Sequence, residues 1–148
     1  MKVLLTAVNS KYIHSNLAVR YLKSFTKDMD YCAEIKEFSI NDREERILEE
    51  IIREEPDVVA FSTYIWNVEM ISRLSNLIKN VDANIEILYG GPEVSFDSRT
   101  YLKENVGDYV IEGEGEKTYR DFISYKLGKM KIEDVRGLHY KKDGEVYT

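Results

Sequence analysis

Short runs of apolar residues alternate along the chain with segments in which apolar residues return every three or four positions. A continuous run predicts a strand covered on both faces, and the longer period predicts a helix with one buried face. The predicted strands are residues 3–8, 32–40, 57–62, 85–89 and 109–111. The predicted helices are residues 17–25, 43–55, 67–80, 98–102 and 117–127. Because each strand precedes a helix through a short connection, the pattern predicts a parallel sheet with helices on both faces.

Polar residues mark where these helices begin and end. Side chains of Ser, Asn and Asp accept hydrogen bonds from the first free amides of a helix, so they favour its first position. The candidate caps are Ser15 or Asn16 for the first helix, Asn41 or Asp42 for the second, and Asp97 or Ser98 for the fourth. Pro56 ends the second helix. The run at 32–40 is the most polar and is predicted near an edge, with Cys32 as a small buried residue.

The last part of the chain departs from this alternation. Residues 137–140 and 145–147 flank a polar turn in which Asp143-Gly144 signals a β-hairpin. We therefore divide the chain into an α/β domain at residues 1–130 and a hairpin or linker at residues 131–148. The hairpin ends without a closing element, which predicts that another domain follows it.

Composition narrows the classes of protein to consider. A chain of 148 residues, 43% of them hydrophobic, fits one domain with a sizeable core. Its single cysteine excludes a disulfide framework, and any zinc or iron–sulfur site built on cysteines within this chain. With 21 basic residues against 27 acidic ones, nucleic-acid binding is not expected. The sequence shows neither a signal peptide nor a membrane span, so we expect a cytoplasmic protein.

Four unusual loops follow predicted strands and therefore share one edge of the sheet. They are residues 9–15, 62–67, 90–96 and 112–116. In a doubly wound parallel sheet, ligands bind beyond the carboxyl ends of the strands, where the first and third strands diverge. We expect a flavodoxin-like (Rossmann-like) α/β fold with five parallel strands in the order 2-1-3-4-5, a C-terminal β-hairpin extension, and a binding site on this edge.

Several functions common on this fold lack their residues. A phospho-acceptor receiver needs an aspartate after the third strand, where Ser62 stands, and an acidic pair after the first, where Asn9-Ser10 stands. A flavin or dinucleotide site needs a phosphate-binding loop after the first strand, and residues 9–14 contain no glycine. The segment Glu112–Glu116 has glycines, but its three carboxylates would repel a phosphate.

The same loops suit a large, flat and mostly uncharged ligand. Gly90-Gly91 leaves bare backbone that a ring can approach closely. Hydroxyl groups and aromatic rings accompany it, from Ser62, Thr63, Tyr12, Tyr64 and Trp66. His14 is the one imidazole in these loops, and it suits either a metal or a hydrogen bond to the first helix.

The four loops carry a resemblance when they are taken in order. They read Asn9-Ser10-Lys11-Tyr12-Ile13-His14-Ser15-Asn16-Leu17-Ala18, Phe61-Ser62-Thr63-Tyr64-Ile65-Trp66-Asn67, Gly90-Gly91-Pro92-Glu93-Val94-Ser95 and Glu112-Gly113-Glu114-Gly115-Glu116. Over essentially the whole chain, this resembles the N-terminal cobalamin (vitamin B12)-binding domain of B12-dependent radical SAM proteins. That group includes anaerobic magnesium-protoporphyrin IX monomethyl ester cyclases.

The resemblance implies that cobalamin lies over the carboxyl edge of the sheet. In the methionine-synthase type of this domain, the nucleotide tail inserts beside the switch point. The site residues that it implies are Asn9, Ser10, Lys11, Tyr12, His14, Ser62, Thr63, Tyr64, Gly90, Gly91, Pro92, Glu93, Glu112, Gly113 and Glu114. Ser62 and Gly90-Gly91 match the serine and the glycine pair of the methionine-synthase type. His14 is the candidate axial ligand of cobalt, although Tyr12 and Leu17 replace the aspartate and glycine of the D-x-H-x-x-G pattern.

The resemblance implies the cobalamin-binding module of a radical SAM enzyme of cyclase or methyltransferase type. The module would hold the corrin ring for a following domain, which would carry S-adenosylmethionine and a 4Fe-4S cluster, and alone it would catalyse nothing. The alternative is a docking or substrate-contact domain that kept the fold and lost the cofactor. A pocket mouth filled by Tyr12, Tyr64 and Trp66 over Gly90 would favour that alternative.

Overall fold

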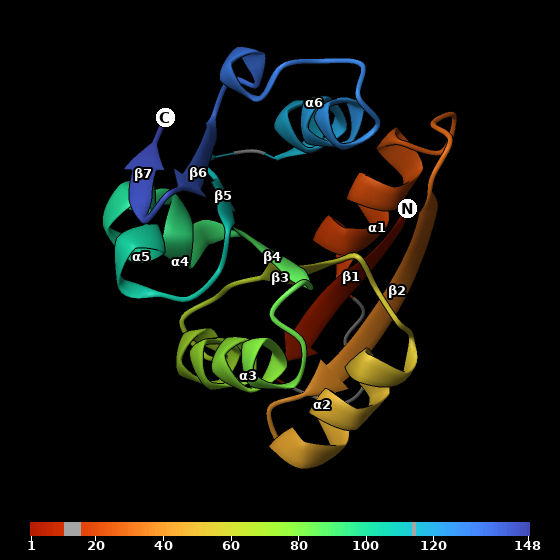
Figure 1. Ribbon diagram of the computed structural model, residues 1–148. Coiled ribbons are helices and arrows are strands. Elements are labelled where there is room, and N and C mark those ends of the chain that lie inside the picture. Colours follow the sequence, from red (N-terminus) through yellow and green to blue (C-terminus); the bar gives the residue numbers. More distant parts are fainter. Residues whose placement is uncertain (11–15, 114) are drawn as a thin grey trace.

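A mixed sheet forms the centre of the computed structural model, which describes residues 1–10, 16–113 and 115–148. The strands β1 (Lys2–Asn9), β2 (Cys32–Ser39), β3 (Val58–Ser62), β4 (Glu86–Gly90) and β5 (Tyr109–Ile111) are parallel. The strands β6 (Leu138–Lys142) and β7 (Glu145–Tyr147) continue the sheet in the antiparallel sense. Across the described residues the order is β2-β1-β3-β4-β5-β6-β7 (Figure 1). The predicted order of the parallel strands is confirmed, and the hairpin raises the number of strands from five to seven.

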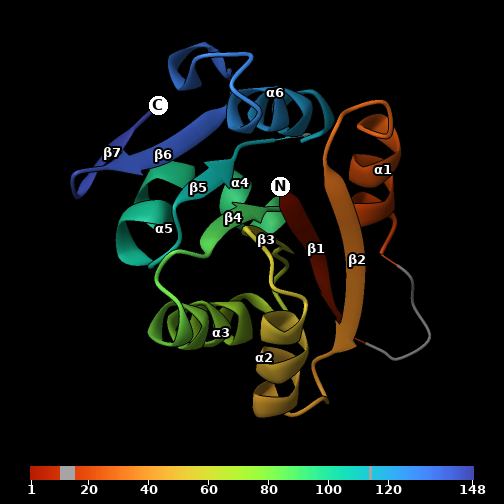
Figure 2. The ribbon, with the colours of Figure 1, turned by 45° about the vertical axis from the view of Figure 1, so that its right-hand side comes forward.

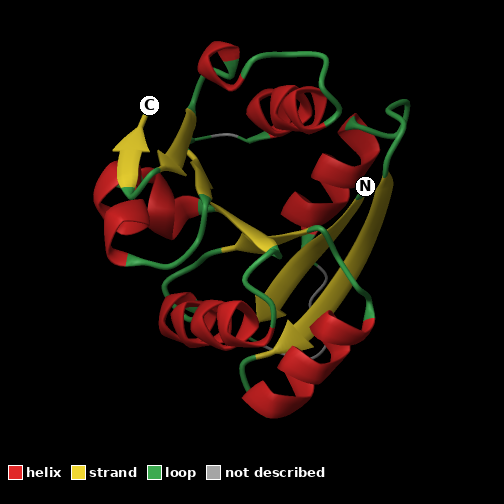
Figure 3. Cartoon of the chain, in the orientation of Figure 1, coloured by secondary structure: helices red, strands yellow, loops and turns green. Residues whose placement is uncertain are grey.

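Helices cover both faces of this sheet (Figure 3). On one face lie α1 (Leu17–Phe25) and α6 (Glu116–Lys126). On the other lie α2 (Glu44–Arg53), α3 (Val68–Val81), the unpredicted short α4 (Pro92–Ser95) and α5 (Ser98–Glu104). An unpredicted 3₁₀ turn, η1 (Ile132–Asp134), connects α6 to β6. The doubly wound α/β class is therefore confirmed. None of the described helices combines the length and apolar character needed to cross a membrane.

Alternate residues of the strands supply two separate cores. Leu4, Val59 and Ile87 belong to the core beneath α2 and α3. Their neighbours on the opposite face, such as Leu5 and Ala60, belong to the core beneath α1 and α6. Because side chains alternate along a strand, the unbroken apolar runs of β1 and β3 serve both faces at once. Figure 2 shows that β2 lies at one edge of the sheet and the β6–β7 hairpin at the other.

Two of the predicted helix caps are present. The side chain of Asn16 accepts a hydrogen bond from the amide of Val19 at the start of α1. The side chain of Asp97 likewise accepts from the amide of Thr100 at the start of α5. Ser15, the alternative cap of the first helix, lies outside the described residues.

Two other local predictions are wrong. Neither Asn41 nor Asp42 caps α2, which begins at Glu44, because the Asp42 carboxylate turns back to accept a hydrogen bond from the amide of Ser39. Cys32 is exposed rather than buried, because it is the first residue of the edge strand β2.

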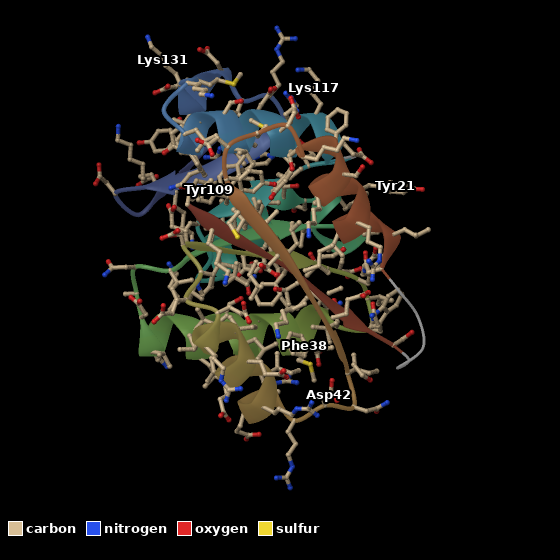
Figure 4. All side chains as sticks on the ribbon, turned by 90° about the vertical axis from the view of Figure 1, so that its right-hand side faces the viewer. Tyr21, Phe38, Asp42, Tyr109, Lys117 and Lys131 are labelled. Atoms are coloured by element: carbon tan, nitrogen blue, oxygen red, sulfur yellow. The ribbon has the colours of Figure 1, made fainter. Side chains whose placement is uncertain are left out.

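Only part of the apolar face of α1 packs against the sheet. Val19 and Leu22 contact the core, whereas Leu17, Tyr21 and Phe25 keep 61%, 57% and 46% of their surface exposed. Figure 4 shows Tyr21 on the outer side of α1, pointing away from the sheet. The one buried face predicted for the helix at 17–25 is therefore only partly buried.

Burial of tyrosine predicts how stability depends on alkaline pH. Tyr89 and Tyr101 pack edge to face with ring centroids 5.0 Å apart, and neither hydroxyl has a hydrogen-bond partner among the described residues. Burial raises the pKa of Tyr89 from 10.0 to about 12. The unfolded chain therefore loses this proton more readily, so the stabilisation is complete below about pH 10 and is lost as pH rises toward 12. We expect the thermal midpoint, followed by circular dichroism, to fall over this range. The decline should be smaller in Tyr89→Phe, and an equal decline would contradict the argument.

Candidate functional site

A cavity of about 430 Å³ opens at the carboxyl edge of the sheet, on the face covered by α1 and α6. Leu5, Ala60, Leu88 and Ile111 line it from four neighbouring strands, and Leu22 lines it from α1. Its volume lies within the usual range for small-molecule sites, roughly 300–1,000 Å³. Glu116 is the one charged residue in the described lining. The cavity therefore suits an apolar group better than a phosphate or another charged group.

Small side chains on the two central strands make room for this cavity. On β3 these are Ala60 and Ser62, and Gly90 stands beside Ser62 in the register of β4. A Cβ atom built on Gly90 would meet no atom of the described residues within 4 Å, apart from its own chain neighbours. Among these residues Gly90 is therefore not needed to avoid a clash, and its missing side chain leaves space at the cavity.

Gly91, unlike Gly90, is required by the fold because its backbone lies against that of Thr63. Its φ is +103°, and a Cβ atom there would lie 2.4 Å from the carbonyl oxygen of Thr63. The Thr63 amide donates to the carbonyl of Gly90 at 2.7 Å, and the Thr63 hydroxyl donates to the same oxygen. The backbones at the ends of β3 and β4 thus lie in direct contact at Gly91, which only glycine allows at this position.

Ser95 connects the loops that follow β4 and β5. Its hydroxyl donates to the carbonyl of Gly91 at 2.8 Å and accepts from the amide of Gly113 at 3.1 Å. All three residues line the cavity. This bridge fixes the side of the cavity that lies farther from β1.

A stacked aromatic pair stands at the opposite side, in the loop after β3. The rings of Tyr64 and Trp66 are 4.5 Å apart and almost parallel, with an interplanar angle of 4°. Tyr64 lines the cavity, and Trp66 keeps 44% of its surface exposed. The indole nitrogen of Trp66 donates to the carbonyl of Val8 at 3.1 Å, so this polar edge of the ring is occupied.

Some of the predicted site residues line the cavity, and others do not. The predicted residues that line it are Ser62, Tyr64, Gly90, Gly91, Pro92 and Gly113. Asn9, Ser10, Thr63, Glu93 and Glu112 are described but are not among its lining residues. Lys11, Tyr12, His14 and Glu114 lie outside the described residues, so the predicted role of His14 at cobalt stays a prediction. Nowhere in the described chain do His, Cys, Asp and Glu gather into a group that could hold a metal ion.

Two of the predicted residues away from the cavity, Thr63 and Glu112, have other partners. Thr63 is fully buried and holds the Gly90 carbonyl, as described above. The exposed carboxylate of Glu112 lies 3.2 Å from Nε2 of His139 on β6. Both contacts support the backbone around the cavity rather than present a group to it.

Sequence reasoning missed the inner part of the cavity. The missed residues include Ala60, Leu88, Ile111 and Leu22. Ser95 and Glu116 lie in two of the loops expected at the site, but they are not among its predicted residues. A signal for some of the missed residues exists, because Ala60, Ser62 and Gly90 place small side chains on one face of adjacent strands. The helix residues carry no such signal, since their position at the cavity depends on how α1 and α6 lie over the sheet.

Comparison with known proteins points to one cofactor. A family model described as the B12 binding domain matches residues 3–123. The cobalamin-dependent radical SAM methyltransferase TokK of Streptomyces tokunonensis is 32% identical over 79 residues, which are 49% of this chain and 11% of that protein. The chain spans a fifth or less of the length of the curated relatives it matches.

Solved structures share the fold over nearly the whole chain. One is the radical S-adenosylmethionine methyltransferase TsrM of Kitasatospora setae, with a TM-score of 0.81, 17% identity and coverage of 98% of this chain and 29% of that one. Another is the cobalamin-dependent S-adenosylmethionine radical enzyme OxsB with aqua-cobalamin and S-adenosylmethionine bound, with a TM-score of 0.78, 20% identity and coverage of 99% and 21%.

Proposed function

The chain belongs to the B12 binding domain family, and we propose that it holds cobalamin over the carboxyl edge of its sheet as the cofactor module of a radical SAM enzyme. The observation that carries this proposal is the cavity of about 430 Å³ beside Gly90, whose described lining is apolar apart from a few polar groups. Relatives named as cobalamin-dependent radical SAM enzymes support the wider assignment.

The residues present fit part of the cofactor inside the cavity and part outside it. A corrin ring with its amide arms is too large for a cavity of about 430 Å³, so the ring would lie over the mouth and the nucleotide tail would enter. Leu5, Leu88 and Ile111 provide apolar surface for the benzimidazole of that tail. Ser62 and Tyr64 offer polar groups at the mouth, and Gly90 leaves the space that the tail requires.

The chain contributes binding and orientation. Bound cobalamin supplies the cobalt-centred chemistry, and the protein determines how the ring is held and which face is covered. S-adenosylmethionine and a 4Fe-4S cluster would belong to a following domain. The names of TokK and TsrM favour a methyltransferase for the whole enzyme, and a relationship to magnesium-protoporphyrin cyclases stays a prediction.

Binding of cobalamin by the purified chain tests the proposal. We expect hydroxocobalamin to co-elute with the chain on a desalting column and to bind with a micromolar or lower Kd. Cobinamide, which lacks the nucleotide tail, is expected to bind about 10- to 100-fold more weakly, because burying an aromatic group contributes about 1.5–3 kcal/mol. Failure to retain hydroxocobalamin would contradict the proposal, and equal affinity for both corrinoids would contradict insertion of the tail.

His14 can be examined in the same titration. If its imidazole ligates cobalt, His14→Ala will change the visible spectrum of the bound cofactor. An unchanged spectrum would eliminate axial ligation by His14 and leave binding itself intact. The cofactor-free docking alternative predicts a mouth filled by Tyr12, Tyr64 and Trp66. Tyr12 lies outside the described residues, so this alternative stays a prediction, and the titration separates it from the cofactor proposal.

A further inference from the structure

The Tyr64–Trp66 stack is held in place although much of it faces solvent. Trp66 is 44% exposed and the intervening Ile65 is 78% exposed. The two rings nevertheless lie 4.5 Å apart within 4° of parallel. Ring stacking positions the two rings relative to each other, and hydrogen bonds to the backbone position them relative to the sheet.

The first contact arises because β1 is longer than β3 at the carboxyl edge. The last pair between these strands joins Ala7 to Ser62, whereas β1 continues beside β2 as far as Asn9. The carbonyl of Val8 therefore extends past the end of β3, where a strand partner is missing. Trp66 Nε1 and Asn67 Nδ2 both donate to this oxygen, at 3.1 and 2.9 Å. The overhang of β1 is thus what anchors the indole ring.

The second contact is the side-chain amide of Asn67, which is only 1% exposed. Its oxygen accepts from the amide of Tyr64 at 2.8 Å. Its nitrogen donates to the carbonyl of Ser62 at 3.1 Å as well as to Val8. One buried amide therefore binds the backbone that carries Tyr64 and the same carbonyl that anchors Trp66.

The position of Asn67 makes this use of its side chain unusual. Asn67 is the residue before the first turn of α3, where an asparagine side chain normally accepts from a helix amide. Here it makes no such capping bond, and it turns back to the preceding loop instead. The amide is therefore committed to the loop that carries the rings.

We propose that Asn67 is a positioning residue that holds the Tyr64–Trp66 stack as a preformed flat platform for one face of the corrin ring. This inference rests on the proposed cobalamin function. Because the platform is ordered before binding, the free energy of binding does not include the entropy cost of immobilising two aromatic side chains. The platform also excludes water from the face of the ring that it covers. The consequence is that a change at Asn67, which need not touch the cofactor, weakens cofactor binding.

Two substitutions of Asn67 and one control separate this role from general stability. Asn67→Asp keeps an acceptor for the Tyr64 amide and suits a helix N-cap, but it loses both donated hydrogen bonds. Asn67→Ala loses all three bonds. Asn76→Ala removes an exposed asparagine amide from the same helix, where it bonds only the carbonyl of Ser72, and serves as the matched control.

Trp66 is the single tryptophan of the chain, so its fluorescence reports directly on the platform. In the cofactor-free chain, Asn67→Asp and Asn67→Ala should shift the emission to the red and increase quenching by acrylamide, and Asn76→Ala should do neither. In titrations with hydroxocobalamin, the Kd should rise about tenfold for both Asn67 variants and stay unchanged for the control.

The two readouts keep the outcomes distinct. If the unsubstituted chain retains no cobalamin, the proposed function fails, while altered fluorescence of Asn67→Asp still supports its role in ordering the rings. Unchanged fluorescence, or altered fluorescence with an unchanged Kd, overturns the proposal. Should both Asn67 variants lose their circular dichroism signal, Trp66→Leu removes the platform and leaves Asn67 intact. An unchanged Kd for Trp66→Leu also overturns the proposal.

Discussion

Gly90→Val is expected to weaken cobalamin binding by up to about 100-fold while the chain remains folded. A Cβ atom at Gly90 meets no atom of the described residues beyond its chain neighbours within 4 Å, and the backbone there does not have a positive φ. The strand conformation itself accepts valine, since β-branched residues favour strands. The added atoms therefore occupy the opening of the cavity rather than the core. Forcing a ligand past two misplaced carbon branches costs about 1–3 kcal/mol, which corresponds to a Kd on the order of 100-fold higher at the upper end.

A graded series makes this expectation precise. Gly90→Ala should weaken binding less than Gly90→Val, and it should leave stability unchanged or raise it by about 0.5 kcal/mol, because alanine restricts the unfolded chain. Urea unfolding followed by circular dichroism measures stability, and a hydroxocobalamin titration measures affinity. Full cobalamin affinity in a folded Gly90→Val chain would show that the cofactor does not use this opening.

Gly91→Ala is expected to have the opposite effect, a large loss of stability. The new Cβ would lie 2.4 Å from the Thr63 carbonyl oxygen and 2.6 Å from its nitrogen, and both are backbone atoms that cannot rotate away. The φ of +103° adds strain for any residue with a Cβ. Together these effects should cost about 3 kcal/mol or more, which lowers the thermal midpoint by roughly 10 °C in a domain of this size.

The measurement for Gly91→Ala is thermal or urea unfolding of the cofactor-free chain. Gly90→Ala is its matched control, because the two substitutions add the same methyl group to adjacent residues. An unfolding midpoint for Gly91→Ala equal to that of Gly90→Ala would contradict the close approach of the β3 and β4 ends. The pair therefore separates a glycine retained for a ligand from a glycine retained for the fold.

Local patterns sufficed to predict most of the architecture. The apolar runs of β1 and β3 are buried on both faces, and Asn16 and Asp97 cap their helices, because strand burial and capping depend on nearby sequence. Cys32 was predicted wrongly because exposure at an edge strand depends on what covers that edge, which a single strand does not reveal.

The part of the site at the strand ends and in the loops after them could be predicted from the sequence. Ser62 and Gly90 end their strands, and Tyr64 and Gly91 come just after them, so the rule for parallel sheets located all four. The depth of the cavity depends on the separation of α1 and α6 from Ala60 and Leu88, which is a property of tertiary packing. The role of Asn67 depends on the carbonyl of Val8, 59 residues earlier, and sequence spacing gives no sign of that contact.

The hairpin has a consequence for solubility. Tyr109, Val110 and Ile111 of β5 are all buried, and β6 pairs with them along their outer side. Without residues 131–148 this short apolar strand would be the open margin of the sheet, ready to pair with β5 of another molecule and begin aggregation. The hairpin moves that margin to the three residues Glu145–Tyr147, of which only Val146 is buried. A fragment that ends at residue 130 would thus expose β5 as an unpaired, aggregation-prone edge strand, which the β6–β7 hairpin covers in the longer chain.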